Sequence, residues 1–101
     1  MSFDPLQPLD TGLAKKWIRQ IIERGVVVHS NHALEQMEED ELTMVDCTNV
    51  LRGGQVQYPE LKDGTWRYRV LTSRICVVVA FRSEEELRIV TAWRIRNSFQ
   101  R

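Results

Sequence analysis

Both histidines of the chain lie in one short stretch, HSNHALEQM, at residues 29–37. Histidine can accept and donate protons near neutral pH, so it suits general acid–base catalysis. His32 falls at the start of an expected helix, and Glu35 or Gln36, within the next turn, could orient its ring. His32 is therefore the candidate acid or base. The alternative is that His32 only begins the helix, as a residue of its first turn.

A metal site is a second possibility for the two histidines. His29 and His32 would need at least one more ligand, and Cys47 and Cys76 stand 29 positions apart without a recognisable ligand spacing. We therefore expect no metal and no cofactor. The cysteines are expected to be buried thiols of a cytoplasmic protein, because the sequence shows neither a signal-peptide pattern nor an apolar run of membrane-spanning length.

Charge is unevenly divided along the sequence, although the formal net charge is zero. Residues 1–63 hold six Lys or Arg against eleven Asp or Glu, whereas residues 64–101 hold eight against three, and all eight are arginine. The guanidinium fork of arginine grips phosphate with two donors at once. This division favours a polyanion-binding surface. The alternative is that the arginines are scattered over the surface or pair with the glutamates at 84–86.

Apolar residues recur at helical spacing in the first half of the chain and alternate in the second half. The expected helices are 12–24, Ser30 or Asn31 through Met37, and 43–52, the last ended by Gly53-Gly54. The expected strands are 26–29, 65–71, 75–82 and 87–95, with a short edge strand at 55–58.

The order of these elements predicts an α+β fold. N-terminal helices are expected to pack on one face of a three- to four-stranded antiparallel sheet, whose last three strands are joined by hairpin-sized links. Residues 1–10, with two prolines, are expected to be a flexible arm. Residues 11–101 are expected to form a single domain with one core.

Strand alternation predicts which arginines share a face of the sheet. The pairs expected from a three-residue link at 72–74 and a four-residue link at 83–86 are Leu71–Ile75, Arg69–Val77, Arg67–Val79, Arg82–Leu87, Val79–Val90, Val77–Ala92 and Ile75–Arg94. One face would then carry Arg67, Arg69, Arg88 and Arg94 around a floor of Val77, Val79 and Ala92. The helices would cover the other face, which would carry Trp66, Tyr68, Val70, Cys76, Val78, Ala80, Ile89 and Trp93.

The pattern formed by HALEQM, a helix ending in VLRGG, and the strands WRYRV and RIVTAW resembles a family of small bacterial domains of unknown function. That family is similar to the RelE, MqsR and BrnT ribonuclease toxins of type II toxin–antitoxin systems, in the fold shared by barnase, EndoU and RelE. The resemblance covers about residues 29–94. The matching residues are His32, Ala33 and Met37 in the opening motif, Gly53 at the helix end, and Arg67, Arg69 and Thr91 in the closing strands.

Two features depart from those toxins. The chain is neutral overall, whereas RelE-type toxins are strongly basic. Its only lysines, Lys15, Lys16 and Lys62, match none of the catalytic lysines of those toxins.

The resemblance implies a toxin-like, metal-independent endoribonuclease that acts on RNA and is neutralised by an antitoxin protein encoded nearby. In such a reaction a base takes the proton of the ribose 2′-hydroxyl, an acid protonates the leaving oxygen, and cations hold the phosphate. The candidate catalytic residues are His32, Glu35, Arg67 and Arg94. The candidates for binding RNA are Arg69, Arg88 and Tyr68. Tyr68 or Trp93 could stack a base only if the strand register is the opposite one. The alternative is a non-catalytic module of the same fold that binds a protein or nucleic acid.

Overall fold

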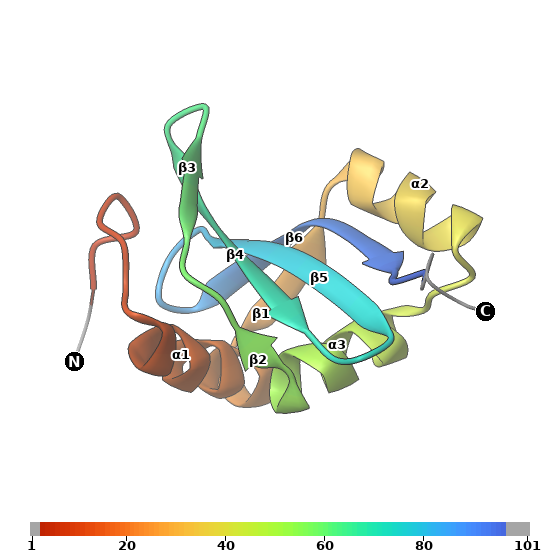
Figure 1. The fold of residues 1–101 in the computed structure, drawn as a ribbon. Coiled ribbons are helices and arrows are strands. Elements are labelled where there is room, and N and C mark those ends of the chain that lie inside the picture. The colour runs from red at the N-terminus through yellow and green to blue at the C-terminus, as the bar shows by residue number, and fades with distance from the viewer. Residues whose placement is uncertain (1–2, 97–101) are drawn as a thin grey trace.

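The computed structural model describes residues 3–96 and has the expected α+β composition, with three helices and a six-stranded mixed sheet (Figure 1). The elements are, in chain order, α1 (Thr11–Arg24), β1 (Val26–His29), α2 (Asn31–Glu39), α3 (Met44–Gly53), β2 (Gln55–Val56), β3 (Glu60–Lys62), β4 (Thr65–Leu71), β5 (Ile75–Phe81) and β6 (Glu86–Arg94). The three predicted helices and the strand at 26–29 are confirmed.

The sheet is larger than predicted and is not purely antiparallel. Its strands follow the order β1-β6-β5-β4-β2, with β3 paired to β4 alone. Strand β1 joins the edge of the sheet and runs parallel to β6. Parallel pairing requires a long connection, and two helices and four strands lie between β1 and β6 in the chain. The expectation of three or four antiparallel strands is therefore wrong, since it left β1 outside the sheet and missed β3.

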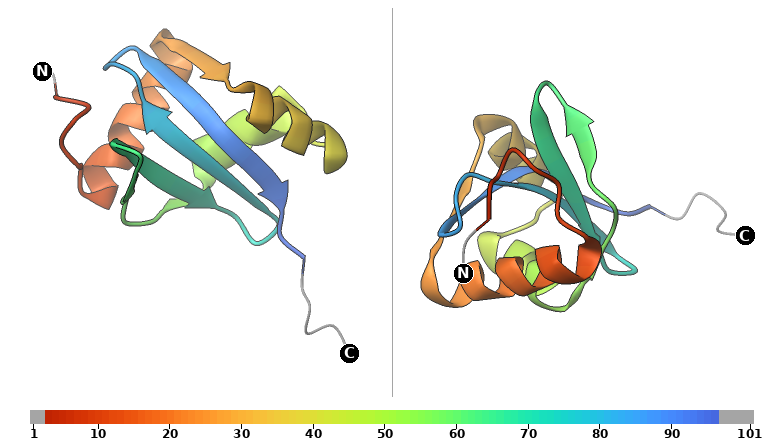
Figure 2. Two further views of the ribbon diagram at one scale, coloured as in Figure 1. Left: turned by 90° about the horizontal axis from the view of Figure 1, so that it is seen from above. Right: turned by 90° about the vertical axis from the view of Figure 1, so that its left-hand side faces the viewer.

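Helices α1 and α3 cover one face of the sheet, as predicted (Figures 1 and 2). Helix α2 instead runs alongside β6, beyond the end of β1 and apart from the other two helices (Figure 2). The buried core between the sheet and its helices consists of Ala14, Trp17, Ile18, Ile21, Ala33, Met37, Leu42, Cys47, Val50, Leu51, Val56, Tyr68, Val70, Val77, Val79, Phe81, Leu87, Ile89 and Ala92.

Each helix begins at a side chain that accepts a backbone N–H of its first turn. Asp10 accepts from Leu13 at 2.8 Å and caps α1. Ser30 caps α2 in the same way. At α3 the predicted capping box is confirmed, because Thr43 accepts from the Asp46 N–H at 3.1 Å while Asp46 accepts from the Thr43 N–H at 2.9 Å. These caps fix where each helix starts and thereby how the strands that follow enter the sheet.

Residues 3–10, expected to be a flexible arm, pack on the domain. The Phe3 ring lies edge-on against Trp17 and Phe81, with ring centroids 4.8 and 5.0 Å away. The backbone N–H of Leu9 donates to the hydroxyl of Tyr68 at 2.8 Å. The segment therefore closes one side of the core.

The register of the β4–β5 hairpin differs from the predicted one by one residue. The Thr72 N–H donates to the Ile75 carbonyl at 3.0 Å, so the loop contains only Ser73 and Arg74, and Leu71 pairs with Cys76. The Thr72 hydroxyl accepts from the N–H groups of Arg74 and Ile75 and holds this tight turn. The predicted pairs Leu71–Ile75, Arg69–Val77 and Arg67–Val79 are therefore wrong. Because side chains alternate between the two faces, this one-residue shift changes which residues of β5 share a face with Arg67 and Arg69.

A β-bulge divides the β5–β6 hairpin. The predicted pairs Ile75–Arg94 and Val77–Ala92 are confirmed, but beyond the bulge Val79 pairs with Ile89 and Phe81 with Leu87, in place of Val79–Val90 and Arg82–Leu87. The extra residue, Val90, turns the two halves of β6 relative to each other. As a result Arg88 and Arg94, predicted to share a face, lie on opposite faces of the sheet.

Candidate nucleic-acid interface

The face of the sheet that α1 and α3 leave uncovered carries arginines above a floor of small side chains. This open face consists of Arg67 and Arg69 from β4, Cys76, Val78 and Ala80 from β5, and Arg88, Val90, Thr91 and Trp93 from β6. Arg82, which follows β5, extends it. The predicted arginine face is thus present, with a floor of Val78 and Ala80 instead of Val77, Val79 and Ala92, and without Arg94.

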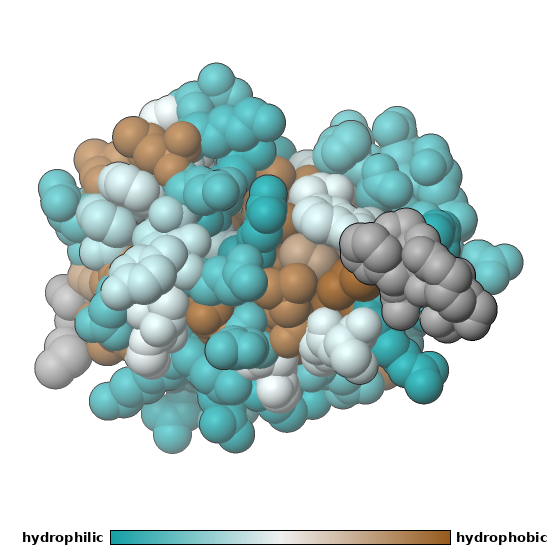
Figure 3. Space-filling view, in the orientation of Figure 1, coloured by the Kyte–Doolittle hydropathy of each residue, from teal (hydrophilic) through white to brown (hydrophobic). Residues whose placement is uncertain are grey.

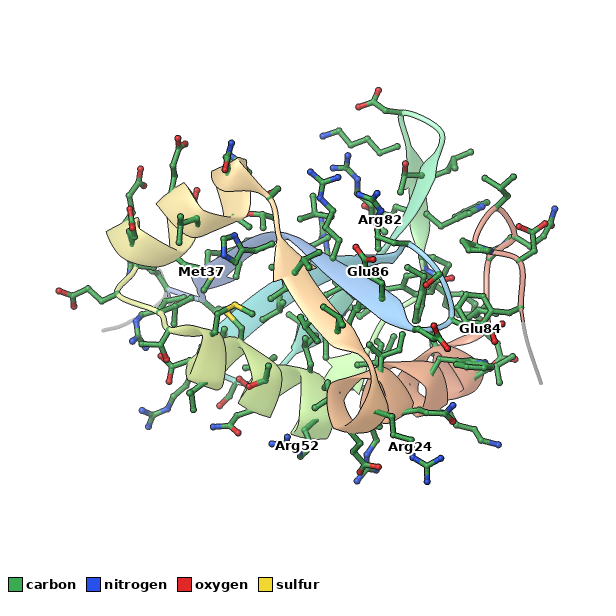
Figure 4. The ribbon with its side chains drawn as sticks, turned by 180° about the vertical axis from the view of Figure 1, so that it is seen from behind. Arg24, Met37, Arg52, Arg82, Glu84 and Glu86 are labelled. Carbon is green, nitrogen blue, oxygen red and sulfur yellow. The ribbon has the colours of Figure 1, made fainter. Side chains whose placement is uncertain are left out.

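A larger hollow of about 440 Å³ lies at one end of the open face. Its charged side chains are Arg67, Arg82 and Arg88, and no acidic residue lines it within the described part of the chain. Figure 4 shows Arg82 on the side of the sheet away from α1 and α3, whereas Arg24 and Arg52 project from those two helices. The hollow therefore gathers positive charge without a compensating carboxylate.

A smaller hollow of about 210 Å³ lies on the other side of Arg67, and its lining consists of Glu60, Lys62, Arg67, Arg69, Val78, Thr91 and Trp93. Glu60 and Lys62 reach it from β3, which with the start of β4 forms a hairpin arm that rises above the open face (Figure 1). The arm turns at Asp63 and Gly64, which have φ angles of 53° and 78°. Positive φ at both positions is the requirement of a two-residue hairpin turn, and Asp-Gly is a preferred sequence for it.

Alternation places Glu60 and Lys62 on the face of the arm that looks over the sheet. Glu60 lies directly opposite Arg67 across the β3–β4 ladder, and its carboxylate is 3.7 Å from the guanidinium of Arg69. Leu61, between them, points the other way and is 58% exposed. The arm therefore brings one carboxylate and one ammonium group to the arginines of the sheet.

Arg67 belongs to both hollows, and its Nε–H is buried without a hydrogen-bond partner. Arginine carries five N–H donors, and a buried donor that lacks a partner costs about 1–3 kcal/mol. A water molecule or a bound ion is one common partner of such a buried donor.

Exposed apolar side chains gather beside the arm. Leu6, Tyr58 and Leu61 are all more than half exposed. Figure 3 shows a hydrophobic patch above the N-terminal segment, next to the hydrophilic tip of the arm. Patches of this kind often mark sites of protein contact.

The predicted acid–base pair of α2 lies outside both hollows. His32 and Glu35 are exposed, and neither lines the larger or the smaller hollow. Among the hydrogen bonds of residues 3–96, none joins His32 to Glu35 or Gln36. Only Ser30, the cap of α2, reaches the larger hollow. The structure therefore does not bring His32 and Glu35 together with Arg67.

Arg94 lies at the end of β6 on the covered side of the sheet, where it forms hydrogen bonds with Asp40 and Glu41 in the segment between α2 and α3. Its backbone N–H donates to the Asp40 carboxylate at 2.7 Å, and its Nε donates to the Asp40 carbonyl at 2.8 Å. Its Nη2 donates to the Glu41 carbonyl at 3.2 Å. The predicted grouping of Arg94 with Arg67 is wrong, because the one-residue shift of the β4–β5 hairpin places Ile75, and with it the paired Arg94, on the face opposite Arg67.

Tyr68 is not available to stack a base. Its side chain is 1% exposed, its hydroxyl accepts from Leu9, and its ring lies edge-on against Phe81. Burial raises the pKa of its hydroxyl. The prediction that Tyr68 points towards the helices is confirmed, and the prediction that it binds RNA is wrong. Trp93, predicted to be covered, is the aromatic residue that lies on the open face.

Glu60, Lys62 and Arg82 line the hollows but were not among the candidate residues. The Asp63-Gly64 turn was the available signal for the first two, since it predicts a hairpin with Lys62 opposite Thr65. Trp93 was expected to stack a base only in the opposite register, and the one-residue shift of the β4–β5 hairpin places it on the face of Arg67 and Arg69.

The two cysteines are buried and free, as predicted. Burial raises the pKa of the Cys47 thiol to about 11, and the Asp46 carboxylate adds to this rise. Burial also raises the pKa of Cys76, against a smaller opposing effect of Arg69. Residues 3–96 contain no group of three or more His, Cys, Asp or Glu side chains placed to hold a metal ion. No helix in the same residues is long and apolar enough to cross a membrane.

The match to a protein family covers the three hairpins β3–β4, β4–β5 and β5–β6 that form the open face. A family model described as a domain of unknown function (DUF4258) matches residues 29–94, which is more than half of the chain. The chain therefore belongs to this family. No curated protein and no solved structure matches the chain significantly.

Proposed function

We propose that this domain binds single-stranded RNA across the open face of its sheet and acts there as a toxin-like, metal-independent endoribonuclease. The observation that carries the proposal is the row of Arg67, Arg69, Arg82 and Arg88 along two adjoining hollows. Guanidinium groups bind phosphate oxygens in pairs, and a groove that spaces several of them suits a chain of phosphates.

The shape of the face favours a single strand over a duplex. The arm rises beside the arginines and Trp93 lies in the smaller hollow, so unpaired bases could reach its ring while the phosphates follow the arginines. Stacking of a base on an aromatic side chain contributes about 1–3 kcal/mol and tolerates any base. The unpartnered Nε–H of Arg67 supports the same reading, because a phosphate drawn between the hollows would relieve its cost.

A non-catalytic RNA-binding module is the second candidate. The position of His32 outside both hollows favours it, because the arginines then lack the acid–base partner expected from the sequence. A toxin would also need an inhibitor. The exposed apolar side chains of Leu6, Tyr58 and Leu61 beside the arm are a suitable surface for an antitoxin that covers the open face.

The proposal is tested by the salt dependence of RNA binding. Each phosphate contact to a single strand contributes about −0.7 to the slope of log affinity against log salt, so four arginines predict a slope of about −3. Replacing two of them in the double variant Arg82→Gln/Arg88→Gln should weaken binding and reduce the slope to about −1.5. The measurement is fluorescence anisotropy of a mixed-sequence 12-nucleotide RNA at several salt concentrations.

The matched control is the double variant Arg24→Gln/Arg52→Gln, which removes the same charge from the helices on the opposite side (Figure 4). It should leave the slope unchanged. Equal losses in the two double variants would mean that net charge alone attracts RNA. Wild-type protein that binds no RNA at low salt would refute the proposed function.

A further inference from the structure

The smaller hollow holds a set of side chains whose chemistry is complementary. Of the residues that line the two hollows, Glu60 alone carries a carboxylate and Lys62 alone an ammonium group. Both come from the three residues of β3, on the same face of the arm. On β4, Arg67 lies directly opposite Glu60, and Arg69 also lines the hollow. An acceptor of protons, a donor of protons and two phosphate ligands therefore surround one space.

We propose that the smaller hollow is the RNA-cleaving centre, with Glu60 as the general base and Lys62 as the general acid. This inference rests on the proposed function. It replaces the acid–base pair expected from the sequence on α2 with one on β3, which is the only element within residues 3–96 that contributes both a carboxylate and an ammonium group to the hollows.

The proposed cleavage step uses only the RNA and the side chains of Glu60 and Lys62 to transfer its two protons. The Glu60 carboxylate takes the proton of a ribose 2′-hydroxyl, and the 2′-oxygen forms a bond to the adjacent phosphorus. The bond between phosphorus and the 5′-oxygen breaks, and that oxygen receives a proton from the Lys62 ammonium group. The products are a 2′,3′-cyclic phosphate and a 5′-hydroxyl end. Exchange with solvent then returns a proton from Glu60 to Lys62.

The two arginines take different parts in this step. The guanidinium of Arg69, 3.7 Å from Glu60, holds the carboxylate at the rim of the hollow. Arg67, whose Nε–H lacks a partner, holds the phosphate oxygens as their negative charge grows. The half-buried ring of Trp93 lines the same hollow, where the base next to the cleaved bond can stack on it.

The first test is cleavage of a labelled mixed-sequence RNA by Glu60→Gln. Loss of a general base typically lowers the rate about 10²- to 10⁴-fold. RNA affinity should stay equal or increase, since the substitution removes a negative charge beside the phosphate. The matched control is Glu86→Gln, which removes the same charge from β6 outside both hollows. It should cleave at the wild-type rate.

The second test uses the pH profile and the product ends. Glu60→Gln should remove the fall in rate on the acid side, and Lys62→Ala the fall on the alkaline side, whereas Lys16→Ala on α1 should change neither. Mass spectrometry should find 2′,3′-cyclic phosphate ends, and a 2′-O-methyl RNA should bind without being cleaved.

The outcomes separate this inference from the proposed function. If Glu60→Gln cleaves at the wild-type rate, the catalytic centre is not the smaller hollow, whereas the proposed RNA binding and cleavage by the domain are unaffected. If the wild type binds RNA with the expected salt slope but leaves it intact, the catalytic assignment is refuted and the domain is a binding module. If it binds no RNA, both proposals fail together.

Discussion

The two faces of one sheet carry opposite kinds of side chain. On the face under α1 and α3, the fully buried residues of β4, β5 and β6 include Val70, Val77, Val79, Leu87 and Ile89. On the open face, β4 and β6 carry Arg67, Arg69, Arg88, Thr91 and Trp93, and β5 carries the small side chains of Cys76, Val78 and Ala80. In β4 and β6, one side chain therefore fills the core while its neighbour in the sequence lies on the open face. In β5 the open-face residues Cys76, Val78 and Ala80 are buried as well.

This difference separates stability from function within a short length of chain. The covered face must fill a closed volume, so its residues are constrained by shape. No helix packs on the open face, so its strands can carry charged arginine side chains, whose burial under the helices would cost free energy. Substitutions on adjacent residues should therefore have separable effects on unfolding and on RNA binding.

Ile89 and Arg88 provide the sharpest contrast, since they are neighbours on β6 and face opposite ways. Ile89→Ala removes a fully buried side chain and should lower the free energy of unfolding by about 2–5 kcal/mol. The RNA affinity of the folded protein should not change. The measurement is urea denaturation followed by RNA binding at a temperature where the variant is folded.

Arg88→Ala should show the opposite behaviour, with a change in unfolding free energy within about 0.5 kcal/mol and a clear loss of RNA affinity. Loss of affinity in folded Ile89→Ala, or a large loss of stability in Arg88→Ala, would contradict the separation of the two faces.

The elements of the fold were largely predictable because their signals are local. The Thr43–Asp46 capping box and the alternation at 65–71 each involve only a few neighbouring residues, and both predictions are confirmed. The place of β1 was not predictable in this way, because its pairing with β6 joins residues about 60 positions apart. β-Hairpins can be read from their links, whereas a parallel edge strand has no such link.

The site was predicted less well than the fold because it depends on register. A tight turn at Ser73-Arg74 and a bulge at Val90 each shift one strand by a single residue. The tight turn moves Trp93 to the open face and Arg94 away from it, and the bulge returns Arg88 to the face of Arg67 and Arg69. Arg67, Arg69 and Arg88 keep their predicted association. Glu60 and Lys62 were missed because three residues are too few to show alternation.

Arg94→Lys tests whether Arg94 belongs to the covered side. Lysine keeps the positive charge but loses the two hydrogen bonds from the guanidinium to the carbonyls of Asp40 and Glu41. The free energy of unfolding should fall by about 1 kcal/mol. RNA affinity and its salt slope should match those of the wild type, whereas a weaker phosphate contact would place Arg94 in the RNA-binding surface after all.

The smallest expected effect concerns acid stability at the cap of α3, a helix of the covered side. Hydrogen bonds from the Thr43 N–H and hydroxyl lower the pKa of Asp46 below its ordinary value. A carboxyl whose pKa is lower in the folded state stabilises the fold above about pH 4, and this contribution disappears as the pH falls through the folded pKa. Asp46→Asn should therefore lower stability at neutral pH and flatten its decline in acid, as measured by urea midpoints between about pH 2 and pH 7. Because this cap belongs to α3, on the covered side of the sheet, RNA binding at neutral pH should be unaffected. An altered salt slope in Asp46→Asn would show that the covered side influences the open face.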